Sequence, residues 1–210
     1  MTGEDGRRPL QSRQSSWARA AATQLAVGNV PPNRISQAGL AFAAIGALAF
    51  AASPHLSPGW RGMCLVAAAV MMQARLVCNL LDGMVAIEGG RRQADGPFWN
   101  EAPDRLSDTA FLVGAGYAAQ DISLGWTAAA LAILVAYLRE LGRAEGFPPD
   151  YCGPMAKQHR MAVLTIGCLV AALWPSPGAI LTLTLWIIVA GAAATAGRRS
   201  LRLIRRLKSR

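Results

Sequence analysis

Residues 79–104 read NLLDGMVAIEGGRRQADGPFWNEAPD and separate two long apolar segments of the chain. The stretch gathers four glycines with several acids and amides, whereas the segments on either side are mostly Ala, Leu and Val. Ionisable side chains at the edge of a membrane helix are costly unless they are paired, solvated or bound to a metal ion. We therefore expect the function of the chain to lie in this stretch.

The composition indicates a membrane protein. The chain has 210 residues, is 53% hydrophobic and only 16% charged, and carries a net charge of +9. A soluble domain is usually about 25% charged. The apolar residues form long runs that neither alternate nor follow one helix face, as is typical of membrane spans. No cleavable signal peptide is expected, because residues 1–19 are polar and rich in arginine.

The four cysteines give no sign of a disulfide or zinc set. Cys64, Cys78, Cys152 and Cys168 have no paired spacing, and three of them lie within or beside apolar runs. We expect them to be reduced packing residues.

Six apolar segments are each close to the ~20 residues that cross a bilayer. They are residues 35–53, 61–81, 105–120, 123–141, 160–174 and 178–197. The predicted fold is therefore an all-α integral membrane bundle of six transmembrane helices. Residues 15–30, with Trp17, Arg19 and an Ala-rich run, predict an additional N-terminal helix that lies in the membrane interface.

The distribution of positive charge predicts the orientation. With both termini on one side, Arg61 is the only Lys or Arg on the other side. The positive-inside rule then places both termini and the polar stretch in the cytoplasm. We expect a multi-pass protein of the inner (cytoplasmic) membrane with its active site at the cytoplasmic face.

Three parts of the chain follow from this division. They are a cytoplasmic N-terminal segment with the interfacial helix (1–34), a six-helix transmembrane domain (35–197) and a basic cytoplasmic tail (198–210). The tail directly follows the last span, so anionic lipid headgroups are its expected partner. Nucleic acid is not expected, because aromatic residues are not interleaved with the basic ones.

Polar residues occur at helical spacing on both sides of the stretch. Asn79 and Asp82 lie three positions apart, Asn100 and Asp104 lie four apart, and Asp108 follows one turn later. Two helices joined by a short connection pack antiparallel and can bring these side chains together. Ligands that are all oxygen favour Mg²⁺ or Mn²⁺ over zinc.

This spacing resembles the signature of the CDP-alcohol phosphotransferases, D-x-x-D-G-x-x-A-R, eight residues, then G-x-x-x-D-x-x-x-D. The corresponding residues here are Asn79, Asp82, Gly83, Ala86 and Ile87, then, after eight residues, Gly96, Asn100 and Asp104. Residues 32–36 (PNRIS) are similar to the family's Pro-Asn-x-Ile-Thr entry to the first span. Further similar positions are Arg139-Glu140, Gly153-Pro154, Lys157 and Arg160.

The resemblance implies a transferase that moves a phosphatidyl-type group from a CDP-linked lipid to an alcohol and releases CMP, and that forms a homodimer. It implies that Asp104 is the general base. It implies one or two Mg²⁺ or Mn²⁺ ions held by Asn79, Asp82, Asn100 and Asp104. The CDP moiety would contact Asn79, Asp82, Gly83, Ala86 and Gly96. The acceptor or its phosphate would contact Arg139, Lys157, His159 and Arg160.

The chain departs from the signature at three positions. Asn79 and Asn100 stand where the family has aspartate, and Ile87 stands where it has arginine. An amide oxygen can still bind Mg²⁺ but brings no charge. We therefore expect one tightly bound ion, or a second one that arrives with the pyrophosphate. The acids that could compensate are Glu88, Asp95, Glu101 and, best placed as a metal ligand, Asp108; Arg91 or Arg92 could replace the lost arginine.

Plainer interpretations stay open for each residue. Asp82 and Asp104 could serve only the local backbone, and Asn79 and Asn100 could form only interhelical hydrogen bonds. Asp108 could pair with Arg105 or Arg139. The basic set of Lys157, His159 and Arg160 could be membrane anchors alone.

Two other functions also stay open. The substitutions by asparagine leave room for a catalytically weakened relative that binds a nucleotide-linked lipid or a partner protein. A small transporter is disfavoured, because the polar residues cluster at one leaflet and transport sites lie near the midplane.

Overall fold

The computed structural model describes residues 15–87 and 94–210, and within these ranges all regular structure is helical. The α-helices are α1 (Ser16–Val27), α2 (Pro32–Ala52), α3 (Pro58–Ile87), α4 (Gly96–Ala118), α5 (Ile122–Ala144), α6 (Lys157–Leu173) and α7 (Pro177–Lys208). A short 3-10 turn, η2 (Ser53–His55), follows α2. The predicted all-α class is confirmed.

Proline sets where several helices begin. Pro32, Pro97 and Pro177 lie in the first two positions of α2, α4 and α7, and Pro58 opens α3. Proline fits there because its fixed φ suits a helix and its missing N–H would have no partner in the first turn. α5 begins differently: the Asp121 side chain accepts a hydrogen bond of 3.0 Å from the backbone N–H of Leu124.

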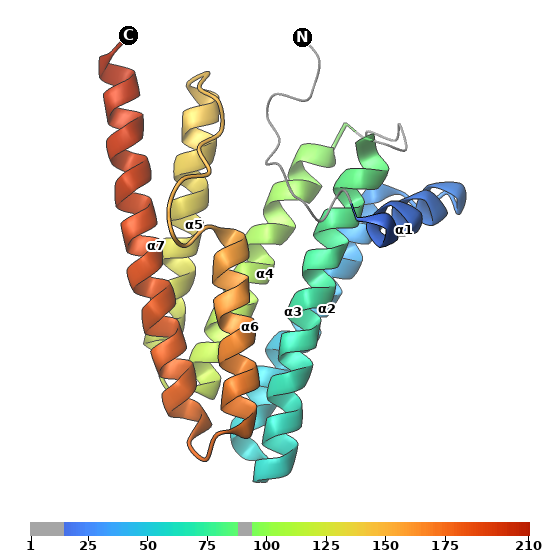
Figure 1. Cartoon of the computed structure of the whole chain (residues 1–210), viewed down its shortest axis with the longest axis vertical. Coiled ribbons are helices and arrows are strands. Elements are labelled where there is room, and N and C mark those ends of the chain that lie inside the picture. The colour runs from blue at the N-terminus through green and yellow to red at the C-terminus, as the bar shows by residue number, and fades with distance from the viewer. Residues whose placement is uncertain (1–14, 88–93) are drawn as a thin grey trace.

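Helices α2 to α7 run along the long axis of the molecule, and consecutive helices are antiparallel (Figure 1). α2 packs on α3 and α4, α5 lies between α4 and α7, and α6 joins α3 to α7. α1 lies beside α3, at an angle to the long helices and near the end where α3 finishes and α4 begins (Figure 1). It packs on α3 through a separate apolar cluster that includes Ala18, Ala22 and Met84.

Two glycines allow α4 and α5 to approach closely at their connection. A Cβ atom added at Gly116 would lie 2.7 Å from the Cα of Gly125 and 2.8 Å from the carbonyl oxygen of Asp121. Both obstacles are backbone atoms, so no side chain can move aside to make room. The position of α4 relative to α5 therefore depends on this contact.

Four helices in the described ranges are long and apolar enough to cross a membrane: α2 with its 3-10 extension, α3, α5 and α7. The other two predicted spans fall short for different reasons. α6 has only 17 residues, fewer than the ~20 that cross a bilayer. α4 has 23 residues, but it carries Glu101, Asp104 and Asp108 in its first turns. Each of the six predicted apolar segments nevertheless corresponds to an α-helix of its own, with at most two residues extending past the end of the helix.

The polar stretch is mostly helical and is divided between two elements. Residues 79–87 finish α3, and residues 96–104 begin α4. At the other end of the chain, α7 continues without a break to Lys208, so the basic tail extends the last helix. Residues 1–14, Glu88, Arg91 and Arg92 lie outside the described residues.

Candidate functional site

A cavity of about 890 Å³ lies at the end of the bundle where α3 finishes and α4 begins. All seven helices contribute to its wall, α1 through Trp17 and α7 through Arg199. It gathers ten of the predicted site residues, namely Asn79, Asp82, Gly83, Ala86, Asn100, Gly96, Asp104, Arg139, Lys157 and Arg160. Two predicted residues, Asp108 and His159, lie outside the lining.

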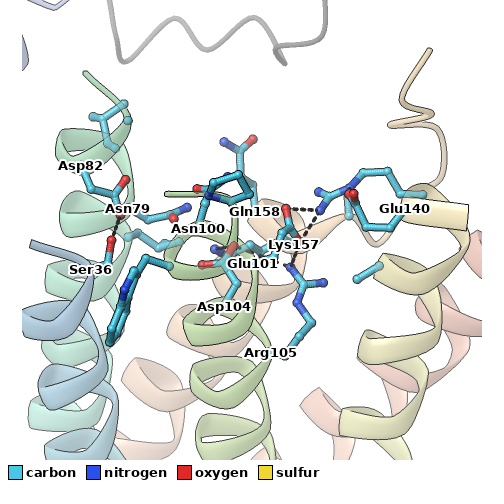
Figure 2. A pocket seen from close by; sticks show the side chains of 18 of the residues that line it. Ser36, Asn79, Asp82, Asn100, Glu101, Asp104, Arg105, Glu140, Lys157 and Gln158 are labelled. Carbon is cyan, nitrogen blue, oxygen red and sulfur yellow. Dashed lines mark hydrogen bonds and ion pairs between the residues drawn. The ribbon is translucent and has the colours of Figure 1, made fainter. Parts of the chain in front are cut away.

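Asp82 belongs to the last turns of α3 and is 6% exposed. The hydroxyl of Ser36 on α2 donates a hydrogen bond of 2.6 Å to its Oδ2 (Figure 2). The other oxygen, Oδ1, is buried and makes no hydrogen bond of normal geometry with a described residue. No cation pairs with Asp82 among the described residues.

Asp104, on α4, has a different environment. Its Oδ1 pairs with Arg75 of α3, and its Oδ2 lies 2.5 Å from Nζ of Lys157 of α6. Arg105 lies farther away, at 3.7 Å from Oδ2. Both oxygens therefore face a cation, which strongly favours the ionised carboxylate at this buried position.

Asn79 connects these groups. In the amide orientation that satisfies its neighbours, Asn79 donates to Oδ1 of Asp104 at 3.2 Å and accepts from Nζ of Lys157 at 3.0 Å. Three helices thus meet through one amide. The hydrogen bonds support the packing interpretation of Asn79, while its place in the cavity wall keeps it next to any ligand.

The remaining residues of the signature leave space for a ligand. Gly83, Ala86, Gly96 and Asn100 line the cavity, and the Asn100 side chain is exposed. A Cβ added at Gly96 would meet no atom within 4 Å. Small side chains on both helices keep this part of the cavity open.

Asp108 lies one turn deeper on α4 than Asp104 and is 2% exposed. It pairs with Arg160, which is 1% exposed, and not with Arg105 or Arg139 as the sequence had left open. Because it lies outside the lining, Asp108 offers no carboxylate to the cavity. The sequence could not show this, because the partner comes from α6, 52 residues away.

Glutamates partly neutralise the basic wall that the sequence predicted. Nη2 of Arg139 lies 2.7 Å from both carboxylate oxygens of Glu101, and Nε of Arg139 lies 2.7 Å from Oε1 of Glu140. Arg105 also contacts Glu101, at 3.2 Å, and Arg143 contacts Glu140, at 2.9 Å. This network connects α4 to α5 along the cavity.

Asp95 and His159 have local contacts. The two Asp95 oxygens accept hydrogen bonds from Asn33 at 2.9 Å and from the Trp99 indole at 3.0 Å, which fastens the start of α4 to the start of α2. His159 is exposed, and its Nδ1 lies 2.9 Å from the carbonyl oxygen of Pro154.

The connection between α5 and α6 positions Lys157. Gly153 has φ +113°, and a Cβ there would lie 2.4 Å from Thr195 of α7. The Thr195 hydroxyl accepts a hydrogen bond of 2.9 Å from the backbone N–H of Met155. Earlier in the connection, the pKa of Asp150 lies below its ordinary value. Partial burial alone would raise this pKa, but the hydrogen bond from the backbone N–H of Cys152 and the positive charge of Arg202 lower it by more. These contacts fix the connection against α7 and place Lys157, at the start of α6, in the wall of the cavity.

The sequence alone missed Ser36 and Arg75 as parts of the site. A signal for Arg75 was present: it lies four residues before Asn79 and seven before Asp82, on the same face of α3. An arginine inside an apolar run is costly and therefore a functional candidate in its own right. Its partner on α4 could not be read from the sequence.

Neither a protein-family model nor a curated protein sequence matches the chain. Solved structures do match. Phosphatidylinositol phosphate synthase of Mycobacterium tuberculosis with CDP-DAG bound has a TM-score of 0.74 and 19% identity, over 90% of this chain and 94% of that one. The same synthase is a CDP-alcohol phosphotransferase. The chain has the fold of that family.

Two more structures of the synthase agree. Its complex with manganese and citrate has a TM-score of 0.74 and 19% identity, over 89% of this chain and 88% of that one. Its apo form has a TM-score of 0.72 and 20% identity, over 88% of this chain and 94% of that one. The fold that the signature implied is thus confirmed over nearly the whole length of both chains.

Proposed function

We propose that the chain is a membrane transferase that moves a phosphatidyl group from a CDP-linked lipid to an alcohol and releases CMP. The observation that carries the proposal is the cavity, whose wall brings together Asn79, Asp82, Asn100 and Asp104 from α3 and α4. The fold is shared with a synthase that has been solved with CDP-DAG bound. A polar cavity at one end of an apolar bundle suits a donor with a charged headgroup and lipid chains.

In the proposed topology α2 to α7 all cross the membrane, and α1 lies in the cytoplasmic interface. Large apolar side chains support this arrangement on the outer faces of the bundle, among them Leu48, Val70, Leu183 and Trp186, which are 53–69% exposed. In water such faces would promote aggregation; in lipid they are solvated. The division into residues 1–34, 35–197 and 198–210, the inner-membrane location and the cytoplasmic termini belong to the same proposal, as does a homodimer.

The site fits one divalent cation. Asp82 and Asp104 both line the cavity, and the buried Oδ1 of Asp82 makes no hydrogen bond of normal geometry with a described residue. The described residues contain no group of three acidic, His or Cys side chains placed to hold a metal ion. Mg²⁺ is nevertheless commonly bound by one or two carboxylates together with substrate phosphates. Asp82 is the proposed charged ligand, with the amide oxygens of Asn79 and Asn100 as neutral ones, whereas both oxygens of Asp104 are already paired with Arg75 and Lys157. When bound, Mg²⁺ or Mn²⁺ would neutralise negative charge on the phosphate oxygens.

Asp104 is the proposed general base. Arg75 and Lys157 hold and orient it as a carboxylate, which is the form that accepts a proton. The acceptor oxygen forms a bond to the phosphorus that carries the diacylglycerol, its proton passes to Asp104, and the pyrophosphate P–O bond breaks with the electron pair leaving on CMP. Gly83, Ala86 and Gly96 would border the cytidine and pyrophosphate.

The acceptor side is proposed to include Arg139, Lys157 and Arg160, all of which line the cavity. His159 would have to turn away from Pro154 to join them. Glu101 and Glu140 already pair with Arg139, so an anionic acceptor would compete with two carboxylates for this arginine.

A turnover assay tests the proposal. Purified full-length protein is given radiolabelled CDP-diacylglycerol, Mg²⁺ or Mn²⁺ and a panel of alcohols that includes glycerol 3-phosphate, serine and inositol phosphate. We expect release of CMP with at least one acceptor. No turnover with any acceptor, together with tight CDP binding, would favour the alternative of a nucleotide-lipid-binding membrane protein.

A further inference from the structure

Arg75 is a buried cation at the centre of the site. Its side chain is 5% exposed, and its guanidinium pairs with Oδ1 of Asp104. Two of its nitrogens, Nε and Nη1, are buried without a hydrogen-bond partner among the described residues. A buried arginine with so few partners is costly to keep. Stability alone therefore does not explain it.

Lys157 completes the charge balance around Asp104. Its Nζ lies 2.5 Å from Oδ2, so the two oxygens of this carboxylate face two different cations. The two positive charges that meet here equal the charge of one divalent ion. They come from α3 and α6 and converge on α4.

The amide of Asn79 is suited to this pair of cations. Its nitrogen donates to the oxygen of Asp104 that Arg75 also contacts, and its oxygen accepts from Lys157. A carboxylate at position 79 could not donate to Asp104, and its negative charge would lie 3.2 Å from an Asp104 oxygen. Asparagine at position 79 therefore suits a site in which Arg75 and Lys157 already supply the positive charge.

Asp82 differs because its carboxylate forms no ion pair with a described residue, and its buried Oδ1 makes no hydrogen bond of normal geometry with one. We propose that Arg75 and Lys157 take the electrostatic place of a second metal ion at Asp104, so that the site binds a single divalent ion, at Asp82. The net charge of the two carboxylates, of Arg75 and Lys157, and of one divalent ion is then two positive charges. The two negative charges of a pyrophosphate diester neutralise them. The inference rests on the proposed function, because it assigns these cations to the donor site.

Metal stoichiometry tests the inference independently of turnover. Mn²⁺ is titrated into the purified full-length protein, with and without saturating CDP, and free Mn²⁺ is followed by electron paramagnetic resonance. We expect one Mn²⁺ per chain in the presence of CDP. Two ions per chain, or none, would overturn the inference.

Variants separate the role of charge from that of packing. The triple variant Arg75→Gln, Asn79→Asp, Asn100→Asp removes one fixed cation and restores two carboxylates, and we expect it to bind two Mn²⁺ per chain. Arg75→Lys keeps the charge and should bind one, which provides a test even if the triple variant does not fold. Arg61→Gln, at the opposite end of α3, is the matched control and should also bind one. A folded triple variant that binds one ion would count against the inference.

Measuring CMP release on the same preparations distinguishes the two proposals. One Mn²⁺ per chain without any CMP release would support the single-ion site and reject the transferase. Two Mn²⁺ per chain with CMP release would reject only the single-ion site.

Discussion

Three aspartates of the same bundle have three different environments. Asp82 accepts from a hydroxyl, Asp104 lies between two cations, and Asp108 pairs with one buried arginine outside the cavity. A carboxylate that faces no cation is the best ligand for a metal ion, whereas a carboxylate fixed by two cations is held ionised and oriented. The same residue type is therefore proposed to bind metal, to accept a proton and to stabilise the fold at these three positions.

Asp82→Asn should weaken the binding of Mn²⁺ and of CDP together, by about tenfold or more, because it removes the charge of the proposed metal ligand. Isothermal titration with each ligand measures this. Asp121→Asn, at the opposite end of the bundle, is the control and should change neither affinity. Unchanged Mn²⁺ affinity in Asp82→Asn would remove Asp82 from the metal site.

Asp104→Asn should abolish CMP release, because an amide cannot accept the proton of the acceptor. It should largely spare CDP binding, since Arg75 and Lys157 remain to meet the pyrophosphate. Turnover and equilibrium binding of labelled CDP measure the two effects separately. Full activity in this variant would exclude Asp104 as the base.

Asp108→Asn should lower the free energy of unfolding by about 3 kcal/mol, because it leaves Arg160 buried without its counter-charge. Mn²⁺ binding should not change if Asp108 is not a ligand. Denaturation in detergent measures stability, and a double-mutant cycle with Arg160→Gln measures the coupling of the pair. A selective loss of Mn²⁺ binding in stable Asp108→Asn protein would restore Asp108 as a metal ligand.

At the scale of elements, the site depends on where α3 and α4 are placed relative to their neighbours. Two contacts fix the position of α4. Its last turns pack closely on α5 at Gly116, and Asp95, just before its start, accepts a hydrogen bond from Asn33 of α2. Its charged first turns can face inward because α3 and α6 present Arg75, Lys157 and Arg160 to them. A mean hydropathy over a short stretch of sequence counts these charged residues as unfavourable in a membrane. It cannot include their partners, which belong to other helices.

Gly116→Ala should destabilise the protein by about 1–3 kcal/mol, because its new methyl group would meet the backbone of α5. The displacement of α4 should also reduce CMP release. Gly59→Ala is the matched control, because a Cβ there meets no atom within 4 Å. Thermal unfolding of both variants measures the difference, and equal stabilities would show that the α4–α5 contact is not close in the protein.

At the scale of the whole molecule, the proposed topology requires α4 and α6 to cross the membrane together with the four more apolar helices. Ser123 lies at the start of α5, and Ser209 follows α7. In the six-span topology these two positions lie on opposite sides. If α4 did not cross, the start of α5 would lie on the cytoplasmic side.

Ser123→Cys and Ser209→Cys can be compared in a background in which the four native cysteines are replaced by alanine. We expect a membrane-impermeant maleimide to label Ser209→Cys from the cytoplasmic side and Ser123→Cys from the other side. Labelling in inside-out and right-side-out vesicles measures this. Labelling of both positions from the cytoplasmic side would contradict the six-span arrangement.

The sequence by itself determined the helical class, the positions of six apolar helices and the two groups of polar residues that line the cavity. It could do so because hydropathy and helical spacing are local properties of the chain. The tertiary structure decided the partners: Arg75 and Lys157 for Asp104, Ser36 for Asp82, and Arg160 for Asp108. These pairs join residues 29 to 53 positions apart. The reason is physical: the charge state and the role of a buried carboxylate depend on which cation packs against it, and only the folded bundle brings the two together.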